Sequence, residues 1–222
     1  MIPQLAFNLP VAEGFARADF FASPANAAAL SALDDPATTR LLLIGPHGAG
    51  KTHLAHIWAR ATGAELLDLA TLPARLPTLS PHARIVIDNA DTGSNQTAPD
   101  ETALFHLHNL LAASGRLLLT ATTPPRDWGL TLPDLLSRLQ ALPTLRLDAP
   151  DDALLSAVLI KLFADRQITV PPNLIPYLVT RMERSIAAAR VLVAALDAHA
   201  LAAARPISRA LAAQVLDSQA PQ

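Results

Sequence analysis

The chain of 222 residues contains no cysteine. This absence excludes disulfide bonds, thiolate metal sites and a cysteine nucleophile. Charged residues are also scarce, at 16% of the chain, and the formal net charge is −2. A balance so close to neutral argues against a protein that is held on DNA mainly by electrostatic attraction.

Long hydrophobic runs are missing as well, although 51% of the residues are hydrophobic. Arg, Asp, His or Pro interrupts each apolar stretch before about 18 residues, so no stretch is long enough to span a membrane. Residues 1–15 lack the basic start and the apolar core of a signal peptide. We therefore expect a cytoplasmic protein without a membrane partner.

Short, continuously apolar segments alternate with segments of helical periodicity, a pattern typical of a parallel sheet with helical connections. One helix is expected to begin near Asp100, after which Leu104, Leu107 and Leu111 share one apolar face. The expected strands are residues 40–45, 64–70, 84–90, 116–122 and 144–149. The sequence thus predicts an α/β fold with a parallel β-sheet flanked by helices.

The pattern changes after Pro150, where four successive segments are helical. The first of them, DDALLSAVLIKLFADRQ, starts at an aspartate cap. We expect an N-terminal tail over residues 1–10, an α/β domain over residues 11–149 and a small all-helical lid domain over residues 150–222.

Lysine is nearly absent, and Lys51, one of only two, follows a glycine-rich turn. The segment GPHGAGKT fits the phosphate-binding pattern G-x-x-x-x-G-K-[ST], with an apolar strand before it and a helix after it. Glycines let backbone N–H groups face phosphate oxygens, and the helix N-terminus adds positive charge. Lys51 is expected to reach the β- and γ-phosphates, and a chance match in a glycine turn is the alternative. The residues expected to bind nucleotide here are Gly45, Pro46, His47, Gly48, Ala49, Gly50, Lys51, Thr52 and His53.

A second site is expected where the apolar segment RIVID ends at Asp88. A carboxylate in this position organises Mg²⁺ in P-loop proteins, together with the hydroxyl of Thr52. The next residue is Asn89, whose amide can orient a water molecule but cannot take its proton. Weak intrinsic hydrolysis is therefore expected, unless Asp91 supplies the missing carboxylate. A strand-end aspartate in a plain turn is the alternative for Asp88.

Several segments resemble, in order, the AAA+ module of the DnaA replication initiator. They are GPHGAGKTHLAHIWA, VIDNAD, LLLTATTPP, LPDLLSRL, DRQITVPPNLIPYLVTRMERS and RVLVAALD, and together they cover nearly the whole chain. Asn89, in place of the second of DnaA's paired aspartates, makes the chain most similar to the shorter Hda-type regulators of DnaA, in their compact alphaproteobacterial form. The resemblance implies a P-loop AAA+ module with a helical lid, and ADP or ATP with Mg²⁺ as cofactors.

The resemblance also implies roles for single residues. Arg138, in DLLSRL, matches the arginine finger that acts in trans on a neighbour's γ-phosphate. Arg190 matches the sensor-2 arginine that reaches the nucleotide from the lid. Thr122 stands at the sensor-1 position, where DnaA usually carries Asp, so a buried strand-end threonine is an equally good interpretation. Surface positions are the alternative for both arginines. The segment FFASPANAAAL resembles the one that packs against adenine, and its candidates are Phe20, Phe21, Ser23 and Asn26.

The segment QLAFNLP resembles the Q-L-x-[LF]-x-[LF] peptide with which bacterial proteins dock on the sliding clamp of the replicative polymerase. Gln4 would supply the polar contact, and Leu5, Phe7 and Leu9 would fill a hydrophobic cleft. An edge strand, or a tail folded onto its own domain, is the alternative.

Function follows from the resemblance as an expectation. DnaA continues beyond its lid into a basic helix-turn-helix domain, which the residues after the expected lid cannot form, so no sequence-specific DNA binding is expected. Docked on the DNA-loaded clamp (the beta subunit of DNA polymerase III), the protein would stimulate hydrolysis of DnaA-bound ATP and so inactivate DnaA. A homodimer is compatible with the side-to-side contacts of AAA+ modules. The alternatives are an AAA+ ATPase that loads a helicase or remodels a partner, and a small-molecule kinase.

Overall fold

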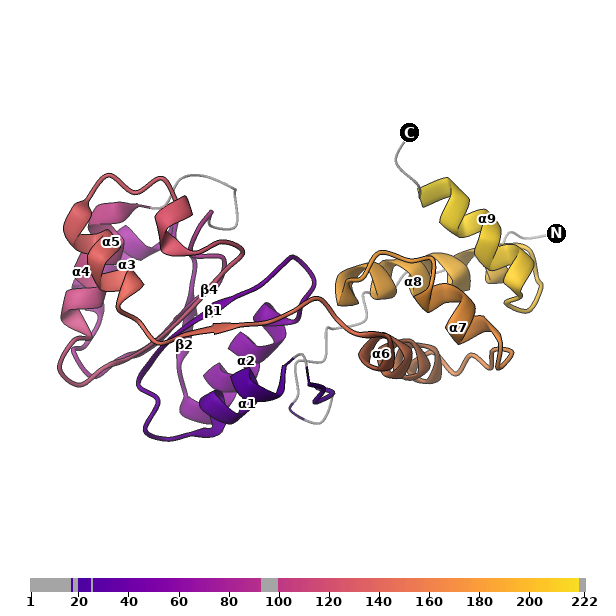
Figure 1. Cartoon of the computed structure of the whole chain (residues 1–222), viewed down its shortest axis with the longest axis horizontal. Coiled ribbons are helices and arrows are strands. Elements are labelled where there is room, and N and C mark those ends of the chain that lie inside the picture. Colours follow the sequence, from indigo (N-terminus) through magenta and orange to yellow (C-terminus); the bar gives the residue numbers. More distant parts are fainter. Residues whose placement is uncertain (1–16, 18–19, 25, 93–99, 220–222) are drawn as a thin grey trace, which may run out of the picture.

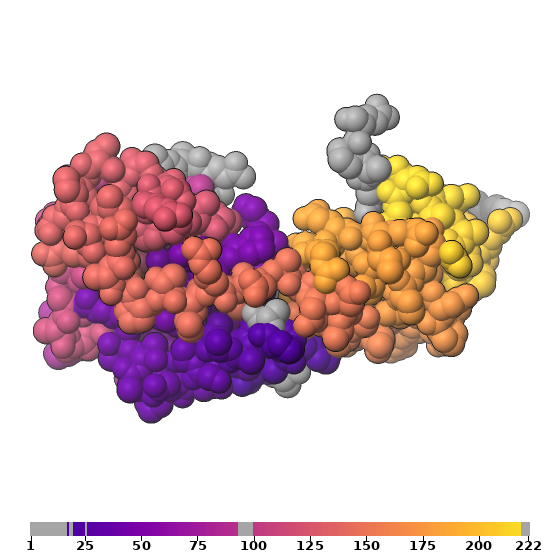
Figure 2. Space-filling view, in the orientation of Figure 1, coloured from indigo at the N-terminus to yellow at the C-terminus, as the bar shows by residue number. Residues whose placement is uncertain are grey.

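The computed structural model describes residues 17, 20–24, 26–92 and 100–219 of the chain. Its elements form an α/β lobe and a helical lobe (Figure 1), and the same two lobes are evident in the space-filling view (Figure 2). The four clamp-binding candidates Gln4, Leu5, Phe7 and Leu9 lie outside these residues. In chain order the elements are α1 (Ala27–Asp34), β1 (Arg40–Ile44), α2 (Lys51–Thr62), β2 (Glu65–Leu67), α3 (Leu72–Arg75), η2 (Leu76–Thr78), β3 (Arg84–Ile87), α4 (Glu101–Leu110), β4 (Arg116–Ala121), η3 (Pro125–Asp127), α5 (Pro133–Gln140), β5 (Thr144–Arg146), α6 (Asp152–Asp165), α7 (Leu174–Val179), α8 (Ile186–Ala202) and α9 (Arg209–Gln219).

The centre of the α/β lobe is a five-stranded parallel sheet with the order β2-β3-β4-β1-β5. Each strand falls within one of the predicted apolar segments, and the predicted α/β fold is confirmed. Side chains alternate between two buried faces: Leu42 and Ile44 of β1 join one hydrophobic cluster, and Leu41 and Leu43 join the other. Helices α1 and α2 cover the second face, and α3, α4 and α5 cover the first (Figure 1).

The strand expected over residues 64–70 is shorter than predicted, because Asp68 turns the chain after Leu67. Its Oδ1 accepts a hydrogen bond from the N–H of Ala70 at 2.8 Å, and its carbonyl oxygen accepts one from the N–H of Leu72 at 3.0 Å. An aspartate that binds the backbone two residues ahead stabilises a turn in place of the next ladder bond. The turn leads directly into α3.

Four helices of the described residues begin at side-chain caps. Asp100, Asp151, Ser185 and Ser208 stand before α4, α6, α8 and α9, and each accepts a hydrogen bond from the backbone N–H three residues later. The predicted helix start near Asp100 and the predicted aspartate cap of the helical segment are confirmed.

The helical lobe has a hydrophobic core of its own, to which α6, α7, α8 and α9 all contribute. Phe163, 1% exposed, is its largest fully buried side chain, and Phe21 from the N-terminal segment packs against the same core. None of the helices in the described part of the chain is long and apolar enough to cross a bilayer.

Candidate functional site

The glycine-rich turn lies at the carboxyl edge of the sheet, between β1 and α2. Gly45 donates its N–H to the carbonyl oxygen of Ala121 at 3.1 Å, which ties the start of the turn to the end of β4. Gly48 and Gly50 have φ values of 74° and 97°, a backbone region that residues with a Cβ adopt only with strain. Gly50 has no side chain to cap α2, so the first N–H groups of the helix face the inside of the turn without a side-chain acceptor.

Lys51 is 5% exposed, and its Nζ donates to the carbonyl oxygens of Gly45 at 2.7 Å and Pro46 at 3.0 Å. Burial lowers the pKa of Lys51 below its ordinary value, and the carboxylates of Asp88 and Asp91 oppose this shift without reversing it. The ammonium group therefore lies inside the turn with only neutral hydrogen-bond partners. An anionic group in the turn would replace these carbonyls and favour the charged form.

Thr52 and Asp88, the two residues expected to bind Mg²⁺, are in direct contact. Oγ1 of Thr52 donates to Oδ2 of Asp88 at 2.8 Å. The hydroxyl of Thr120, on β4, donates to the other carboxylate oxygen, Oδ1. Both oxygens of Asp88 are thus oriented before any ligand binds.

Thr120 is a site residue that sequence reasoning missed. It is fully buried, and its Oγ1 also accepts a hydrogen bond from the N–H of Asn89 at 2.9 Å. Strand pairing places Ile87 beside Leu119, so the residues that follow them, Asp88 and Thr120, are neighbours. The available signal was a single hydroxyl in the apolar run RLLLTA.

Asn89, the residue in place of a second carboxylate, has a φ of 52° and turns the chain sharply after β3. Its Nδ2 lies 3.5 Å from Oδ2 of Asp88. The amide therefore faces the same carboxylate as Thr52 does. It can hold a water molecule near Asp88, but it has no group that accepts a proton at neutral pH.

Asp91, the other candidate for the missing carboxylate, is buried at 6% exposure. Its Oδ2 accepts hydrogen bonds from the N–H of Thr122 at 2.7 Å, from the hydroxyl of Thr122, and from the N–H of Thr123 at 3.2 Å. Oδ1 is buried and has no hydrogen-bond partner among the described residues. The N–H and the hydroxyl of the sensor-1 candidate Thr122 are thus both bonded to Asp91. These bonds hold the end of β4 against the turn after β3.

The lid meets the glycine-rich turn through the start of α8. The N–H of Ile186 donates to the carbonyl oxygen of Gly48 at 3.0 Å. A Cβ on Gly48 would lie 1.9 Å from Oγ of Ser185, so only glycine permits this approach. Arg190 is half-buried on the same helix, one turn beyond Ile186. The structure therefore brings the helix that carries Arg190 onto the turn that carries Lys51.

The candidates for an adenine pocket have different surroundings. Phe20 lies against the ring of His53, with ring centres 5.3 Å apart and planes at 80°, and its Cε2 is 3.8 Å from the position of a Cβ on Gly50. Phe21 instead packs on the lid core. Asn26 is buried and holds the preceding residues in a turn. Its Nδ2 donates to the carbonyl oxygen of Phe21 at 2.9 Å, and its Oδ1 accepts from the N–H of Ser23 at 2.8 Å. Phe20 and His53 are thus the candidates that border the turn.

Arg138 lies on α5, on the face of the sheet opposite α2. Its Nε donates to Oδ2 of Asp134 at 3.2 Å, and its guanidinium carbon lies 5.3 Å from the ring centre of Phe105. The side chain is 39% exposed. None of these partners belongs to the glycine-rich turn, so the described contacts orient Arg138 on the outer surface of the lobe.

No family model matches the chain. Among solved structures, domain III of the Thermotoga maritima replication initiation protein DnaA superimposes with a TM-score of 0.76 over 95% of this chain and 98% of that domain, at 14% sequence identity. AMPPCP-bound DnaA from Aquifex aeolicus gives a TM-score of 0.62 over 80% of this chain, at 15% identity. The Thermotoga maritima RuvB Holliday junction branch migration motor also gives 0.62, over 81% of this chain, at 19% identity.

The chain spans 63% of the Aquifex DnaA chain and 61% of the RuvB chain. At these sequence identities the likeness concerns the fold. The five-stranded parallel sheet, the glycine-rich turn after β1 and the helical lobe behind it therefore give this chain the AAA+ fold of DnaA domain III and RuvB.

Proposed function

We propose that the chain is a nucleotide-bound AAA+ regulator of replication initiation that stimulates hydrolysis of DnaA-bound ATP. One contrast within the site carries the proposal. Lys51, Thr52 and Asp88 form a site suited to hold a nucleotide and Mg²⁺. The residue after Asp88, where a carboxylate could accept a proton from water, is the amide Asn89. A chain that holds a nucleotide without readily hydrolysing it is suited to present an arginine to the nucleotide of a partner.

The nucleotide is ADP or ATP, held by residues 45–53. Its phosphate oxygens would replace the carbonyl oxygens of Gly45 and Pro46 as hydrogen-bond acceptors for Nζ of Lys51. The first N–H groups of α2 would face the same phosphates. Mg²⁺ would bind between Thr52 and Asp88. One carboxylate and one hydroxyl suffice, because Mg²⁺ bound to nucleotides completes its coordination with phosphate oxygens and water.

Arg138 acts in trans on the ATP of DnaA. Its exposed position on α5 and its contacts with Asp134 and Phe105 support this role, because a finger must be oriented and still reach a neighbouring molecule. The residues Gln4, Leu5, Phe7 and Leu9 dock the chain on the DNA-loaded sliding clamp, which brings it to newly replicated DNA. A homodimer would use the same contact surface, either as a storage form or as a second active form.

The experiment follows labelled ATP prebound to DnaA. We expect that the chain together with the DNA-loaded clamp accelerates its conversion to ADP. Arg138→Ala should lower this acceleration by about 10³-fold, the effect of removing an arginine finger. Arg60→Ala, which removes an exposed arginine from α2, is the matched control and should act as the wild type does. Acceleration that survives Arg138→Ala would refute the assignment of the finger.

The clamp contact is tested separately. Gln4→Ala combined with Leu5→Ala should abolish binding to the clamp and leave binding of ADP unchanged. Undiminished clamp binding would overturn the role of the tail.

The alternative is an AAA+ ATPase that loads a helicase or remodels a partner, and the RuvB-like fold favours it as the second candidate. Such a protein must turn over its own ATP many times. Substantial turnover of free ATP, lost in Asp88→Ala, together with no effect on DnaA, would favour this alternative over the regulator.

A further inference from the structure

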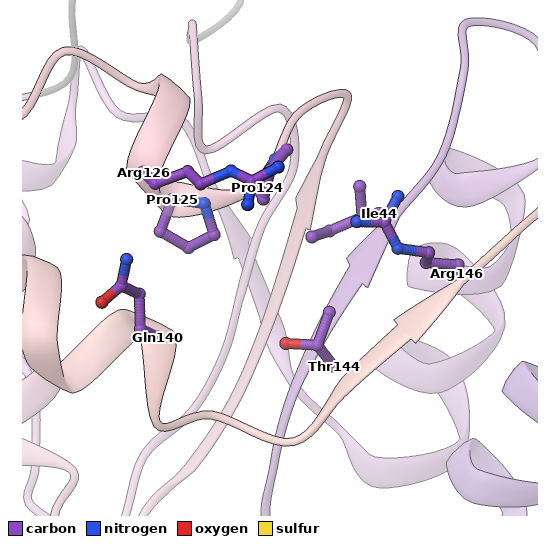
Figure 3. A pocket seen from close by; sticks show the side chains of 7 residues that line it. All are labelled: Ile44, Pro124, Pro125, Arg126, Gln140, Thr144 and Arg146. Carbon is purple, nitrogen blue, oxygen red and sulfur yellow. The ribbon is translucent and has the colours of Figure 1, made fainter.

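A hollow of about 220 Å³ lies beside the edge strand β5, between the end of α5 and the segment after β4. Its walls come from segments far apart in the sequence: Pro124, Pro125 and Arg126 after β4, Gln140 at the end of α5, and Ile44, Thr144 and Arg146 at the ends of β1 and β5 (Figure 3). We call it the arginine hollow. The side chains of Arg126 and Arg146 extend toward each other from opposite walls (Figure 3).

The arginine hollow carries positive charge with little compensation. None of its lining residues is acidic. Arg126 lies 3.6 Å from Oδ1 of Asp127, in a pair whose side chains are 71% and 51% exposed, and such exposed pairs contribute little. The guanidinium group of Arg146, a residue whose backbone pairs with β1 in the sheet, makes no hydrogen bond or ion pair with another side chain or backbone group that the structure describes. Two guanidinium groups thus face one opening without a strong anionic partner.

One wall of the arginine hollow is held in place by the candidate nucleotide site. Asp91 accepts hydrogen bonds from Thr122 and Thr123, the two residues that precede Pro124. Nε1 of Trp128 donates to the carbonyl oxygen of Thr123 at 2.8 Å from the other side. Proline fixes its own φ, so the segment that carries Arg126 is ordered before binding. A preformed wall lowers the entropy lost on association.

The size and chemistry of the arginine hollow fit a side chain. Pockets for small molecules usually measure about 300–1,000 Å³, more than this hollow offers. A planar guanidinium binds a carboxylate through two parallel hydrogen bonds, and the amide of Gln140 adds a further donor beside the apolar floor of Ile44 and Pro125. We propose that the arginine hollow is a docking site for an acidic side chain of a partner protein, which Arg126 and Arg146 hold from two sides.

The arginine hollow lies at the same end of α5 as Arg138. Gln140, in its wall, follows Arg138 by two residues, about 3 Å along the helix axis and about 200° around it, so the two side chains point to different sides of α5. A protein interface covers about 800 Å² of each partner, enough to include both. The identity of the partner rests on the proposed function: it is the AAA+ protein whose ATP meets Arg138. The hollow anchors that partner, and Arg138 acts on its nucleotide.

The experiment measures the Kd between the full-length, fluorescently labelled chain and ATP-bound DnaA. Arg126→Ala combined with Arg146→Ala should raise the Kd at least about tenfold, because buried interface arginines are frequent hot spots. The double lysine variant should fall between this variant and the wild type, since an ammonium keeps the charge without the planar fork. Arg60→Ala with Arg205→Ala, which removes two exposed arginines elsewhere, should bind as the wild type does. Thermal unfolding of each variant checks that it is folded.

The outcomes separate the docking site from the proposed function. A double alanine variant that is folded and binds DnaA as tightly as the wild type overturns the inference. Arg138→Ala should keep the Kd within about threefold of the wild type while hydrolysis is lost, which assigns docking and chemistry to different arginines.

If the wild type does not bind DnaA, the proposed function fails and the hollow is tested by itself. The probes are capped tetraglutamate and tetraglutamine peptides, followed by NMR at the arginine Nε–H groups of the full chain. Shifts at Arg126 and Arg146 with tetraglutamate alone support the inference. No shifts, or tighter binding of inorganic phosphate than of tetraglutamate, overturn it.

Discussion

The ammonium group of Lys51 is buried among carbonyl oxygens of its own turn, at 2.7 Å and 3.0 Å, and not in an ion pair. Neutral acceptors satisfy its hydrogen bonds but do not repay the loss of hydration of a charge, which is why burial lowers its pKa. Asp88 and Asp91 supply negative charge nearby. An anionic ligand would therefore be a stronger hydrogen-bond partner for Lys51 than the carbonyl oxygens that it now contacts.

This environment predicts how nucleotide binding depends on pH. In the proposed site, phosphate would bind the protonated form of Lys51, so bound nucleotide would raise the pKa that burial lowers. At a pH below the pKa of the free protein, affinity for ADP should be constant. Above it, binding must take up a proton, and affinity should fall by up to about tenfold per pH unit, beginning below the ordinary lysine value of 10.5.

Calorimetric titrations of ADP between about pH 8 and about pH 10 measure this dependence. Lys51→Met, which keeps the length of the side chain without the charge, is the control. Its affinity should be at least about tenfold weaker at the lower pH, and it should not change over the range. A wild-type profile as flat as that of Lys51→Met would show that Lys51 does not change protonation on binding.

Asp91 is a second single residue with a clear energetic role. Its Oδ2 receives the N–H groups of Thr122 and Thr123 and the hydroxyl of Thr122, in partly buried hydrogen bonds. Asp91→Ala should lower the free energy of unfolding by about 2–4 kcal/mol, since hydrogen bonds to a charged acceptor contribute about 1.5–3 kcal/mol each and water can reach only some of the donors that lose their acceptor. Urea denaturation measures the change. Asp217→Ala, on an exposed position of α9, should change it by less than about 0.5 kcal/mol.

At the scale of elements, the contact that defines the site is the start of α8 on the glycine-rich turn. One hydrogen bond, from the N–H of Ile186 to the carbonyl oxygen of Gly48, is made at 3.0 Å. Ser185 caps α8 and fills the space that a side chain at position 48 would need. The turn and the lid helix therefore limit each other's position.

Gly48→Ala tests this contact, with Gly63→Ala as a matched control. Both glycines have left-handed φ values, 74° and 70°, so alanine adds similar backbone strain of about 1–2 kcal/mol at either position. Only at position 48 does the new Cβ meet an obstacle, at 1.9 Å from Oγ of Ser185, whereas nothing lies within 4 Å at position 63. Gly48→Ala should therefore expose the amide of Ile186 to faster hydrogen exchange and weaken ADP binding at least about tenfold, and Gly63→Ala should do neither. Equal behaviour of the two variants would mean that the lid does not depend on this contact.

At the scale of the molecule, the sheet and the helical lobe follow directly from hydrophobic periodicity. The contacts between distant segments do not. RLLLTA predicts a buried strand, but only the register of β3 against β4 brings Thr120 to Asp88 and sets Thr122 against Asp91. From the sequence alone, a threonine that binds a nucleotide looks the same as one that binds a carboxylate. The sequence also does not show that Arg126 and Arg146 line the same hollow. These relations depend on strand order and on loops, for which a single sequence has no local signal.

The two lobes meet at the candidate nucleotide site, so a nucleotide that contacts both should couple their stabilities. Turn residues 45–52 would hold its phosphates from one side, and Arg190 on α8 would reach it from the other. ADP at about 100 times its Kd should stabilise the folded chain by about 2.7 kcal/mol.

We expect hydrogen exchange in the wild type to slow in both lobes when ADP is added. In Arg190→Ala, the protection should remain in α2 and β1 and be lost from α8. Arg205→Ala, an exposed lid arginine, is the control and should retain protection in both lobes. Protection of α8 that persists in Arg190→Ala would show that the contact of Ile186 with Gly48 alone couples the lobes, and that Arg190 is a surface residue of the lid.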